Sequence, residues 1–339
     1  MLNSIKKNKK IYLIAEACDN HFGSLDNAKL MIRLAKKNGA DIIKFQHHIP
    51  DEEMLPIVPK SKNFKLSLYK FLKKYALKLK DHEILKKYCK KNNITYLCTP
   101  FSYKAAKELN ELGVSFFKVG SGEFTDLMFI EKLLKFNKPI IFSTGMSSVN
   151  EINFMYKYLK KNKFKNQEIA FMNCTSEYPP RINDINLKFI LQMQKNYSDF
   201  TIGHSDHTNS IYTSLSAASL GARIIEKHVY LDDLNFGPDR DVSISFKQLN
   251  QLSNGLNIIE KALGRNKKIY PKEQKIRSWA RRSLVSLRDL FPGEKITKKD
   301  FFSKRPGIGI PSKDYKKIIG KKVKKKINKN SLIRFTDFK

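Results

Sequence analysis

Short apolar segments alternate with longer amphipathic segments through the first 265 residues of this 339-residue chain. The apolar segments are typical of buried strands, and they occupy residues 11–15, 42–45, 95–98, 116–119, 140–143, 169–173, 200–202 and 223–226. The amphipathic segments are typical of helices that cover a sheet with one face, and they occupy residues 25–38, 81–92, 104–112, 126–136, 149–161, 185–194, 210–220 and 246–263. Eight strand–helix units in succession predict an α/β fold, a (β/α)8 TIM barrel over residues 1–265. A doubly wound open sheet is the alternative, but no glycine-rich phosphate fingerprint follows the first strand.

The pattern changes after residue 265. We expect a linker over residues 266–280, followed by a small, mostly β domain over residues 281–339. Its predicted strands span residues 283–288, 302–305 and 331–335, with a turn at residues 290–294. A domain of this size buries little apolar core by itself, so we expect it to pack on the barrel or on a partner subunit.

The chain carries a formal net charge of +33 at pH 7. Its lysines are spread along the whole sequence, which is typical of solvated helix surfaces. Basic tracts such as residues 321–326 lack the interleaved aromatic side chains on which nucleic-acid bases stack. We therefore expect no nucleic-acid partner, although the positive field should attract anionic substrates.

No apolar run is long enough to span a bilayer. The basic residues 1–10 lead into a short apolar run that ends at Glu16, so this run is predicted as a first strand and not as a signal peptide. The four cysteines, Cys18, Cys89, Cys98 and Cys174, are not spaced as a zinc knuckle or a redox pair. We expect reduced thiols, no membrane partner and a cytoplasmic location.

Polar side chains follow every predicted strand at its carboxyl end. They are Glu16, Lys44, Gln46, Thr99, Lys118, Ser121, Glu123, Ser143, Thr144, Asn173, Thr175, Ser176, Ser205, His207, Glu226 and His228. In a (β/α)8 barrel these ends form one mouth, and active sites lie there. Eight polar strand ends that converge on one face therefore predict an active site.

Two lysines and several hydroxyl groups within this set predict an anion site. Lys44 and Lys118 would point into one cavity, and Thr99, Ser121, Ser143 and Ser205 would add hydroxyl donors. Glycines 120, 122, 145 and 203 allow backbone N–H groups to approach a ligand. This combination suits phosphate and carboxylate groups. For either lysine alone, a buried ion pair with a neighbouring carboxylate is the alternative.

His207 and His228 follow the seventh and eighth predicted strands, which are neighbours in a barrel. Two neutral imidazoles suit a divalent transition-metal ion and leave coordination positions open for substrate. A purely structural, hydrogen-bonded role is the alternative.

Four acids lie near the predicted mouth: Glu16, Glu123, Glu226 and Asp239. Each of them can move a proton or bind a sugar hydroxyl. Asp239 ends the segment 235–239, whose Gly-Pro-Asp sequence turn chemistry explains equally well.

The chain resembles the sialic acid synthase family nearly from end to end. The resemblance rests on residues 14–16, 20–23, 39–41, 44–46, 98–101, 118–123, 143–146, 174–179, 205–208, 226–228 and 237–239. In the tail, residues 282–284 and 304–309 are similar to the antifreeze-like (SAF, β-clip) domain that these synthases carry. The resemblance implies a cytoplasmic transferase that condenses phosphoenolpyruvate with N-acetylmannosamine or a related amino sugar, such as a 6-deoxy diacetamido hexose, in surface carbohydrate biosynthesis.

The resemblance also implies roles for individual residues. Glu16, Glu123, His207 and His228 would be catalytic, and His207 and His228 would bind manganese or magnesium. Gln46, Tyr178, Asp239 and Arg305 would contact the sugar, with Arg305 supplied by the partner subunit of a domain-swapped homodimer. The phosphoenolpyruvate site would consist of Lys44, Thr99, Lys118, Ser121, Ser143, Ser176 and Ser205.

Three positions depart from the family pattern. Cys18 stands where many members have glycine, His47 and His48 replace a smaller polar pair, and Ser176 occupies a position that is asparagine in some members. Synthesis of N-acetylneuraminic, legionaminic and pseudaminic acid all remain open. The alternative function is another phosphoenolpyruvate-dependent or aldol-type barrel enzyme, and a different class is a non-catalytic sugar-binding protein.

Overall fold

The computed structural model describes residues 10–57, 66–232, 239–264 and 266–339. The chain divides into two compact units, Met1–Leu263 and Gly264–Lys339. Within the described residues, no helix is both long and apolar enough to cross a membrane.

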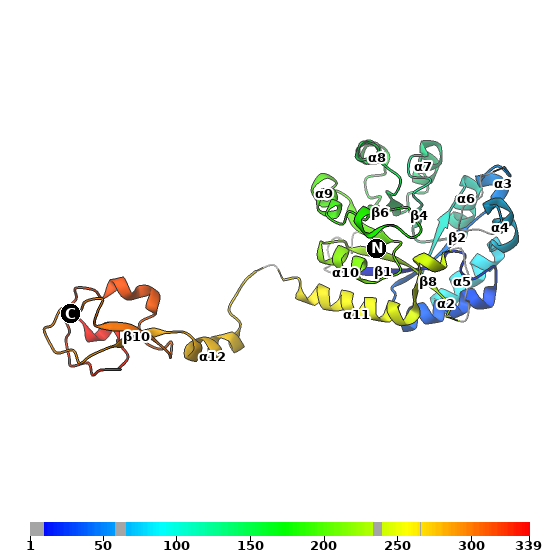
Figure 1. Cartoon of the computed structure of the whole chain (residues 1–339). Coiled ribbons are helices and arrows are strands. Elements are labelled where there is room, and N and C mark those ends of the chain that lie inside the picture. The colour runs from blue at the N-terminus through cyan, green and yellow to red at the C-terminus, as the bar shows by residue number, and fades with distance from the viewer. Residues whose placement is uncertain (1–9, 58–65, 233–238, 265) are drawn as a thin grey trace. The chain divides into compact units, whose positions relative to one another are not determined.

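Eight parallel strands form a nearly closed barrel in the first unit, which confirms the predicted fold class (Figure 1). The strands pair in the order β3-β2-β1-β8-β7-β6-β5-β4, and β3 also lies beside β4. Their bounds are β1 Tyr12–Glu16, β2 Ile42–His47, β3 Thr95–Pro100, β4 Phe117–Val119, β5 Ile140–Ser143, β6 Ile169–Cys174, β7 Thr201–Asp206 and β8 Ile224–Tyr230. A two-residue strand, β9 (Ile244–Ser245), extends the pairing from β8.

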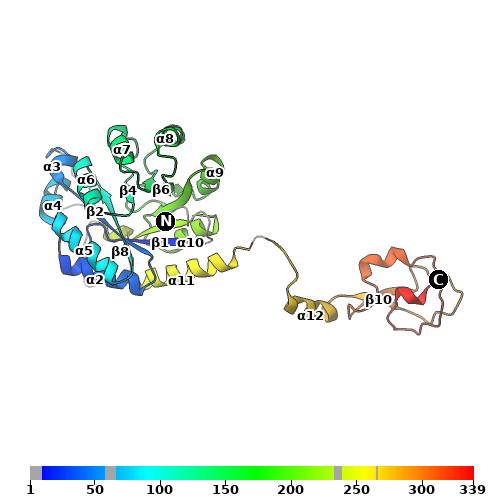
Figure 2. The ribbon, with the colours of Figure 1, turned by 180° about the vertical axis from the view of Figure 1, so that it is seen from behind.

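Helices surround the strands in both views (Figures 1 and 2). Those that follow the barrel strands are α2 Leu25–Lys37, α5 Leu79–Lys91, α6 Tyr103–Glu111, α7 Leu127–Leu134, α8 Val149–Asn162, α9 Phe189–Asn196, α10 Tyr212–Ser219 and α11 Phe246–Ala262. The local sequence determines where several of these helices begin. Ser148 accepts a hydrogen bond from the Glu151 backbone N–H while the Glu151 carboxylate accepts from Ser148, a capping box that fixes the first turn of α8.

One apolar cluster fills the barrel below its mouth. We call it the apolar plug, and it consists of Ile14, Ile42, Leu97, Phe116, Ile141, Ala170, Met172 and Ile224. Side chains alternate between the two faces of a strand, so residues two positions apart point the same way. Ile14 therefore faces inward directly below Glu16, and Ile42 faces inward below Lys44. The plug gives the polar mouth a dry base.

Three helices occur where the sequence analysis assigned none. The segment between β2 and α5 contains α3 (Pro50–Glu53) and α4 (Leu68–Tyr75), and α12 (Pro271–Ala280) lies within the stretch expected to be a linker. Helix α12 has no buried residue, so it lacks the apolar stripe by which an amphipathic helix is identified.

The second unit contains one antiparallel pair, β10 (Ser283–Ser286) and β11 (Phe301–Lys304), and several isolated bridges. The prediction of a strand over residues 331–335 is wrong. Leu332 forms only a single bridge with Val285, and a short 3-10 helix, η4 (Phe335–Asp337), begins at the last residue of that range. The unit has its own core, which includes Leu284, Leu290, Ile296, Ile318 and Ile333.

Candidate active site

A cavity of about 400 Å³ opens at the carboxyl ends of the barrel strands. Every residue to which the sequence analysis gave an individual role lines it except Arg305, which belongs to the second unit. Of the other polar strand ends, Thr144, Asn173 and Thr175 do not line this cavity. The predicted residues that line it are Glu16, Lys44, Gln46, Thr99, Lys118, Ser121, Glu123, Ser143, Ser176, Tyr178, Ser205, His207, Glu226, His228 and Asp239. The structure therefore brings together side chains that are more than 220 residues apart in the sequence.

Strand register explains which of these side chains meet. Glu16 at the end of β1 pairs with Lys44 on β2 and with His228 on β8. Ser205 on β7 pairs with Glu226 on β8. On its other side Glu226 pairs with Ile14 of the apolar plug, so the register alone does not set Glu226 level with Glu16. We call the polar side chains that meet beside the plug the polar layer; they are Glu16, Lys44, Lys118, Ser205 and Glu226.

Two lysines and two glutamates make up the charged part of this layer. Lys44 Nζ lies 2.9 Å from Glu226 Oε2 and 3.4 Å from Glu16 Oε2. Lys118 Nζ lies 3.9 Å from Glu226 Oε1, and Ser205 donates a hydrogen bond of 2.8 Å to the same oxygen. Glu226 therefore bridges the two ammonium groups, and all four charged side chains are buried.

The protonation of these groups follows from burial and from their neighbours. Burial disfavours the charged form of Glu226, but the ammonium groups of Lys118 and Lys44 outweigh it and hold the pKa of Glu226 well below its usual value. Burial raises the pKa of Glu16 to about 7, against the opposing effect of Lys44. Burial lowers the pKa of Lys118 to about 8. Near neutral pH the layer thus holds carboxyl and amino groups that can exchange protons.

Small side chains gather beside Lys118 and form the candidate anion site. Lys118 Nζ donates a 2.6 Å hydrogen bond to Ser143 Oγ, and the Gly145 N–H donates to Ser121 Oγ at 3.1 Å. A Cβ atom on Gly145 would lie 2.1 Å from Ser176 Oγ and 2.7 Å from Ser121 Oγ. Only glycine lets both hydroxyls approach this point, which agrees with a built pocket for an oxyanion.

Thr99 Oγ1 and Glu123 Oε2 are among the buried lining atoms that have no hydrogen-bond partner. An unsatisfied buried polar atom costs about 1–3 kcal/mol, so such atoms mark places where a ligand group or water is expected. Burial raises the pKa of Glu123 to about 7. Glu123 is therefore a second carboxyl group in the cavity that can take up or release a proton near neutral pH.

One wall of the cavity consists of Tyr178, His207 and His228. The Tyr178 and His207 rings stack with centroids 4.4 Å apart, and the His207 and His228 centroids are 5.1 Å apart. His207 Nδ1 contacts the Thr175 carbonyl oxygen at 2.8 Å, which orients the ring so that Nε2 lies 3.3 Å from the Tyr178 hydroxyl. The two predicted metal ligands are thus adjacent.

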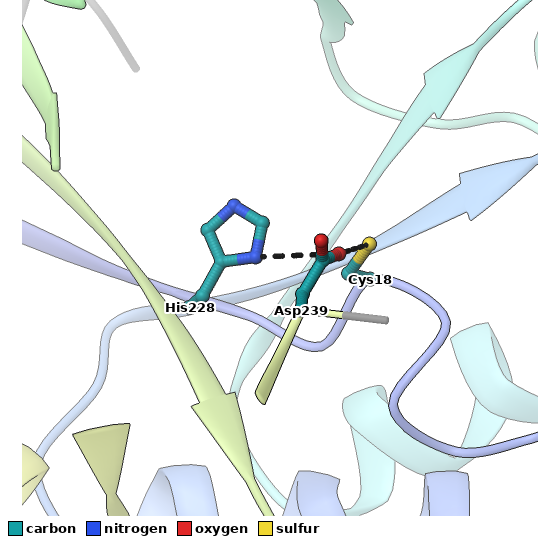
Figure 3. A group of neighbouring side chains, drawn as sticks. All are labelled: Cys18, His228 and Asp239. Atoms are coloured by element: carbon teal, nitrogen blue, oxygen red, sulfur yellow. Dashed lines mark hydrogen bonds and ion pairs between the residues drawn. The ribbon is translucent and has the colours of Figure 1, made fainter. Parts of the chain in front are cut away.

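A group of three potential metal ligands lies at the same wall (Figure 3). The ligand atoms of Cys18, His228 and Asp239 all lie within 4.8 Å of one another, and the three residues are buried. This is the one such group found among the described residues. His228 Nδ1 lies 3.7 Å from Asp239 Oδ2 and has no hydrogen-bond partner. Nitrogen, oxygen and sulfur donors with an unsatisfied nitrogen suit a divalent ion, so the residues present fit a metal. Of the predicted segment 235–239, Asp239 is described and residues 235–238 lie outside the described residues.

Sequence reasoning gave no role in the site to several other lining residues: Cys18, Asp19, His48, Leu68, Phe101, Met146 and Cys174. His48 is connected to Glu16 through Gln46. The His48 ring nitrogen Nε2 lies 2.9 Å from Gln46 Oε1, and Gln46 Nε2 donates a 2.9 Å hydrogen bond to Glu16 Oε1. The departure of His47 and His48 from the family pattern was the available signal for this contact.

Lys227, between Glu226 and His228, points to the opposite face of β8. Its ammonium lies 3.2 Å from Asp206 Oδ1, and both side chains are buried. Burial opposes the charged form of Asp206, but Lys227 outweighs it and keeps the pKa of Asp206 low. The alternation along β8 therefore separates a structural ion pair from the cavity.

In the second unit, Arg305 Nε donates a 3.0 Å hydrogen bond to the Ala280 carbonyl, and its guanidinium lies 5.8 Å from the Trp279 ring centroid. These contacts place Arg305 beside the end of α12.

Comparisons with known proteins show similarity along most of the chain. A family model described as the NeuB family matches residues 31–268, and a SAF domain model matches residues 281–339. N,N'-diacetyllegionaminic acid synthase of Campylobacter jejuni is 39% identical over 334 residues, which cover 96% of this chain and 99% of that protein. A pseudaminic acid synthase of the same species is 31% identical, with 100% and 99% of the two chains covered.

Among solved structures, N-acetylneuraminic acid (sialic acid) synthetase of Leptospira borgpetersenii, in complex with citrate, superposes with a TM-score of 0.71. It is 30% identical and covers 79% of this chain and 90% of its own.

Proposed function

This chain belongs to the NeuB family, and we propose that it condenses phosphoenolpyruvate with an N-acetylated amino sugar to give a nonulosonic acid and phosphate. The relatives are named as synthases of legionaminic, pseudaminic and N-acetylneuraminic acid. The observation that carries the proposal is the buried layer in which Lys44 and Lys118 share Glu226 beside a pocket of hydroxyl groups.

The lysines would bind the phosphate and carboxylate groups of phosphoenolpyruvate. A phosphate dianion carries more charge than the Glu226 carboxylate, so it can compete for both ammonium groups. The hydroxyls of Ser121, Ser143 and Ser176 would donate hydrogen bonds to the same anion. This placement would leave C3 of phosphoenolpyruvate free to face the sugar.

The carboxyl groups would serve the bond-forming steps. The C3 carbon attacks the sugar aldehyde, the aldehyde oxygen takes up a proton, and positive charge develops at C2. A carboxylate of Glu16 or Glu123 would stabilise that charge and then accept a proton from the water that adds to C2. The C2–O bond to phosphate then breaks, the hydroxyl group that water added to C2 gives its proton to the departing phosphate, and its oxygen becomes the keto oxygen of the product. The pKa values of about 7 suit both carboxyls to these transfers.

A divalent ion would be held at the wall formed by His207, His228 and Asp239. When bound there, it supplies Lewis-acid polarisation of the sugar aldehyde. The sequence resemblance implies manganese or magnesium for this role. The sugar would extend from this wall toward Gln46 and Tyr178. We further propose a homodimer in which Arg305 of the partner subunit contacts the sugar.

The test is a sugar panel with purified protein, phosphoenolpyruvate and manganese. We expect phosphate release only when an N-acetylated amino sugar is present, with a matching nonulosonic acid detected by mass spectrometry. Lys44→Met, which keeps most of the length of the side chain and removes its charge, should abolish phosphate release. Two outcomes would refute the synthase assignment. One is phosphate release in the absence of any sugar, and the other is no phosphate release with N-acetylmannosamine or with any of the 6-deoxy diacetamido hexoses.

A further inference from the structure

Three elements distant in the sequence bring one thiol, one imidazole and one carboxylate together. Cys18 lies in the loop after β1, His228 lies on β8, and Asp239 precedes the short 3-10 helix η2 (Arg240–Val242). Figure 3 shows the Asp239 carboxylate between the other two side chains, in contact with both. No other cysteine of the described residues belongs to a group of this kind.

His228 supplies independent evidence that this group binds a metal ion. The residue is 4% exposed, and its Nδ1 atom is buried with no hydrogen-bond partner. It faces Asp239 Oδ2 at 3.7 Å. In a tetrahedral site with metal–ligand distances of about 2.0–2.3 Å, neighbouring ligand atoms lie about 3.3–3.7 Å apart. The imidazole and the carboxylate are therefore already spaced as ligands of one ion.

Cys18 occupies a backbone conformation that does not favour it. Its φ is 46°, in the left-handed region where a side chain other than glycine is strained. Strain of this kind costs on the order of 1–3 kcal/mol and persists where the surroundings or a function maintain it. The conformation directs the sulfur to Asp239, to which the thiol donates a hydrogen bond.

We propose that Cys18 is a direct ligand of the divalent ion, together with His228 and Asp239. The proposal deepens the proposed function and rests on it for the role of the ion. When the sulfur–metal bond forms, the thiol proton passes to solvent and the hydrogen bond to Asp239 is replaced by coordination of both groups. His207, next to His228, remains available as a further ligand.

A thiolate changes the preferred ion. Carboxylate and water ligands suit magnesium and manganese, whereas thiolate and imidazole ligands suit zinc and cobalt. This chain should therefore bind Zn²⁺ and Co²⁺ more tightly than Mn²⁺, and Mn²⁺ more tightly than Mg²⁺. A thiolate ligand would also make metal retention sensitive to oxidation of one cysteine.

The test is the absorption spectrum of the reduced full-length protein titrated with Co²⁺, without substrates. We expect a near-ultraviolet thiolate-to-cobalt charge-transfer band that saturates at one ion per chain. Cys18→Gly should abolish the band. Glycine suits a φ of 46°, so this variant should fold as well as the parent protein, which circular dichroism and thermal unfolding can verify.

Cys174→Ala is the matched control, because Cys174 also lines the cavity and its sulfur lies 4.0 Å from His207 Nδ1. This variant should keep the band. Loss of an outer-sphere partner typically weakens metal binding about 10–100-fold. We expect Cys18→Gly to weaken Zn²⁺ binding by more than this, as measured by competition with a chromophoric chelator. Cobalt binding without the band, a band that survives Cys18→Gly, or equal zinc affinity would each overturn the proposal.

The readout separates this proposal from the proposed function. The band and the zinc affinity need no phosphoenolpyruvate and no sugar, so they report on Cys18 even if the sugar panel gives no product. Conversely, turnover to the expected product without a charge-transfer band would support the synthase assignment and overturn the proposal that Cys18 is a metal ligand.

Discussion

Glu226 keeps two buried ammonium groups charged in the absence of substrate. It contacts Lys44 Nζ at 2.9 Å and Lys118 Nζ at 3.9 Å, and it accepts a hydrogen bond from Ser205. Removing one partner of a buried ion pair leaves the other charge uncompensated, which is usually worse than losing the pair as a whole.

We expect Glu226→Gln to lower the free energy of unfolding by about 3–5 kcal/mol, because Lys118 then loses its carboxylate partner and Lys44 keeps only Glu16. Urea denaturation followed by circular dichroism measures this change. Added phosphate should stabilise the variant more than the parent protein, since the anion replaces the missing charge. Glu83→Gln, which removes only an exposed pair with Lys87, is the control and should change stability little. Equal effects of the two substitutions would contradict the role of Glu226.

Glu123 should make stability depend on pH. Burial raises its pKa from 4.5 to about 7 in the folded protein. The folded state therefore binds more protons than the unfolded state between these values, and stability falls as pH rises through this window. We expect the unfolding free energy to fall more steeply from pH 5 to about pH 7.5 in the parent protein than in Glu123→Gln. Glu16 titrates in both proteins, so the difference reports on Glu123; identical pH profiles would rule out the raised pKa.

Residue types at strand ends predicted many members of the cavity but not their contacts. Lys44, Lys118, His207 and His228 follow directly from strand position. The approach of Cys18 to Asp239 depends on one left-handed residue in a loop, and no periodic pattern encodes such a conformation. The bridging position of Glu226 likewise requires the strand register.

At the scale of elements, β7 shows how closely the barrel interior is filled. Gly203 lies two residues before Ser205, at the level of the apolar plug. A Cβ atom there would lie 2.7 Å from the Ile224 backbone carbonyl oxygen on the neighbouring strand β8. Backbone atoms cannot move aside as a flexible side chain would, so the strands themselves must separate.

We therefore expect Gly203→Ala to destabilise the protein by about 1–3 kcal/mol through overpacking. Differential scanning calorimetry measures the change. Gly264→Ala is the matched control, since a Cβ at that exposed position meets no atom within 4 Å. An unchanged melting temperature in the Gly203→Ala variant would show that β7 and β8 are less tightly packed than described.

Hydrophobic periodicity predicted the eight strands and the helices that follow them because each buries an apolar face against the same core. It did not predict α3, which has four residues, the eight-residue helix α4, or the polar helix α12. It also assigned a strand to residues 331–335, where the small unit is held by isolated bridges and short turns. Elements that bury little leave little pattern in the sequence.

At the scale of the whole molecule, the proposed exchange of second units can be tested by subunit complementation. Lys44→Ala disables the barrel of a chain, and Arg305→Ala disables its tail. If each barrel uses the partner's Arg305, mixed dimers contain one intact site, and random mixing should restore about a quarter of the sites. The measurement is phosphate release at limiting sugar after co-expression of the two variants. If each barrel uses its own Arg305, co-expression will restore no activity.

The apolar plug has a consequence for how such a barrel diversifies. Each inward-facing strand position near the mouth lies two residues from one that maintains the fold, so selection can act on the two sets separately. A lineage can exchange the side chains at the mouth while the plug preserves the barrel. The relatives of this chain, which are named for three different acids, agree with such divergence. Cys18 would then be one more substitution at the mouth that leaves the barrel unchanged.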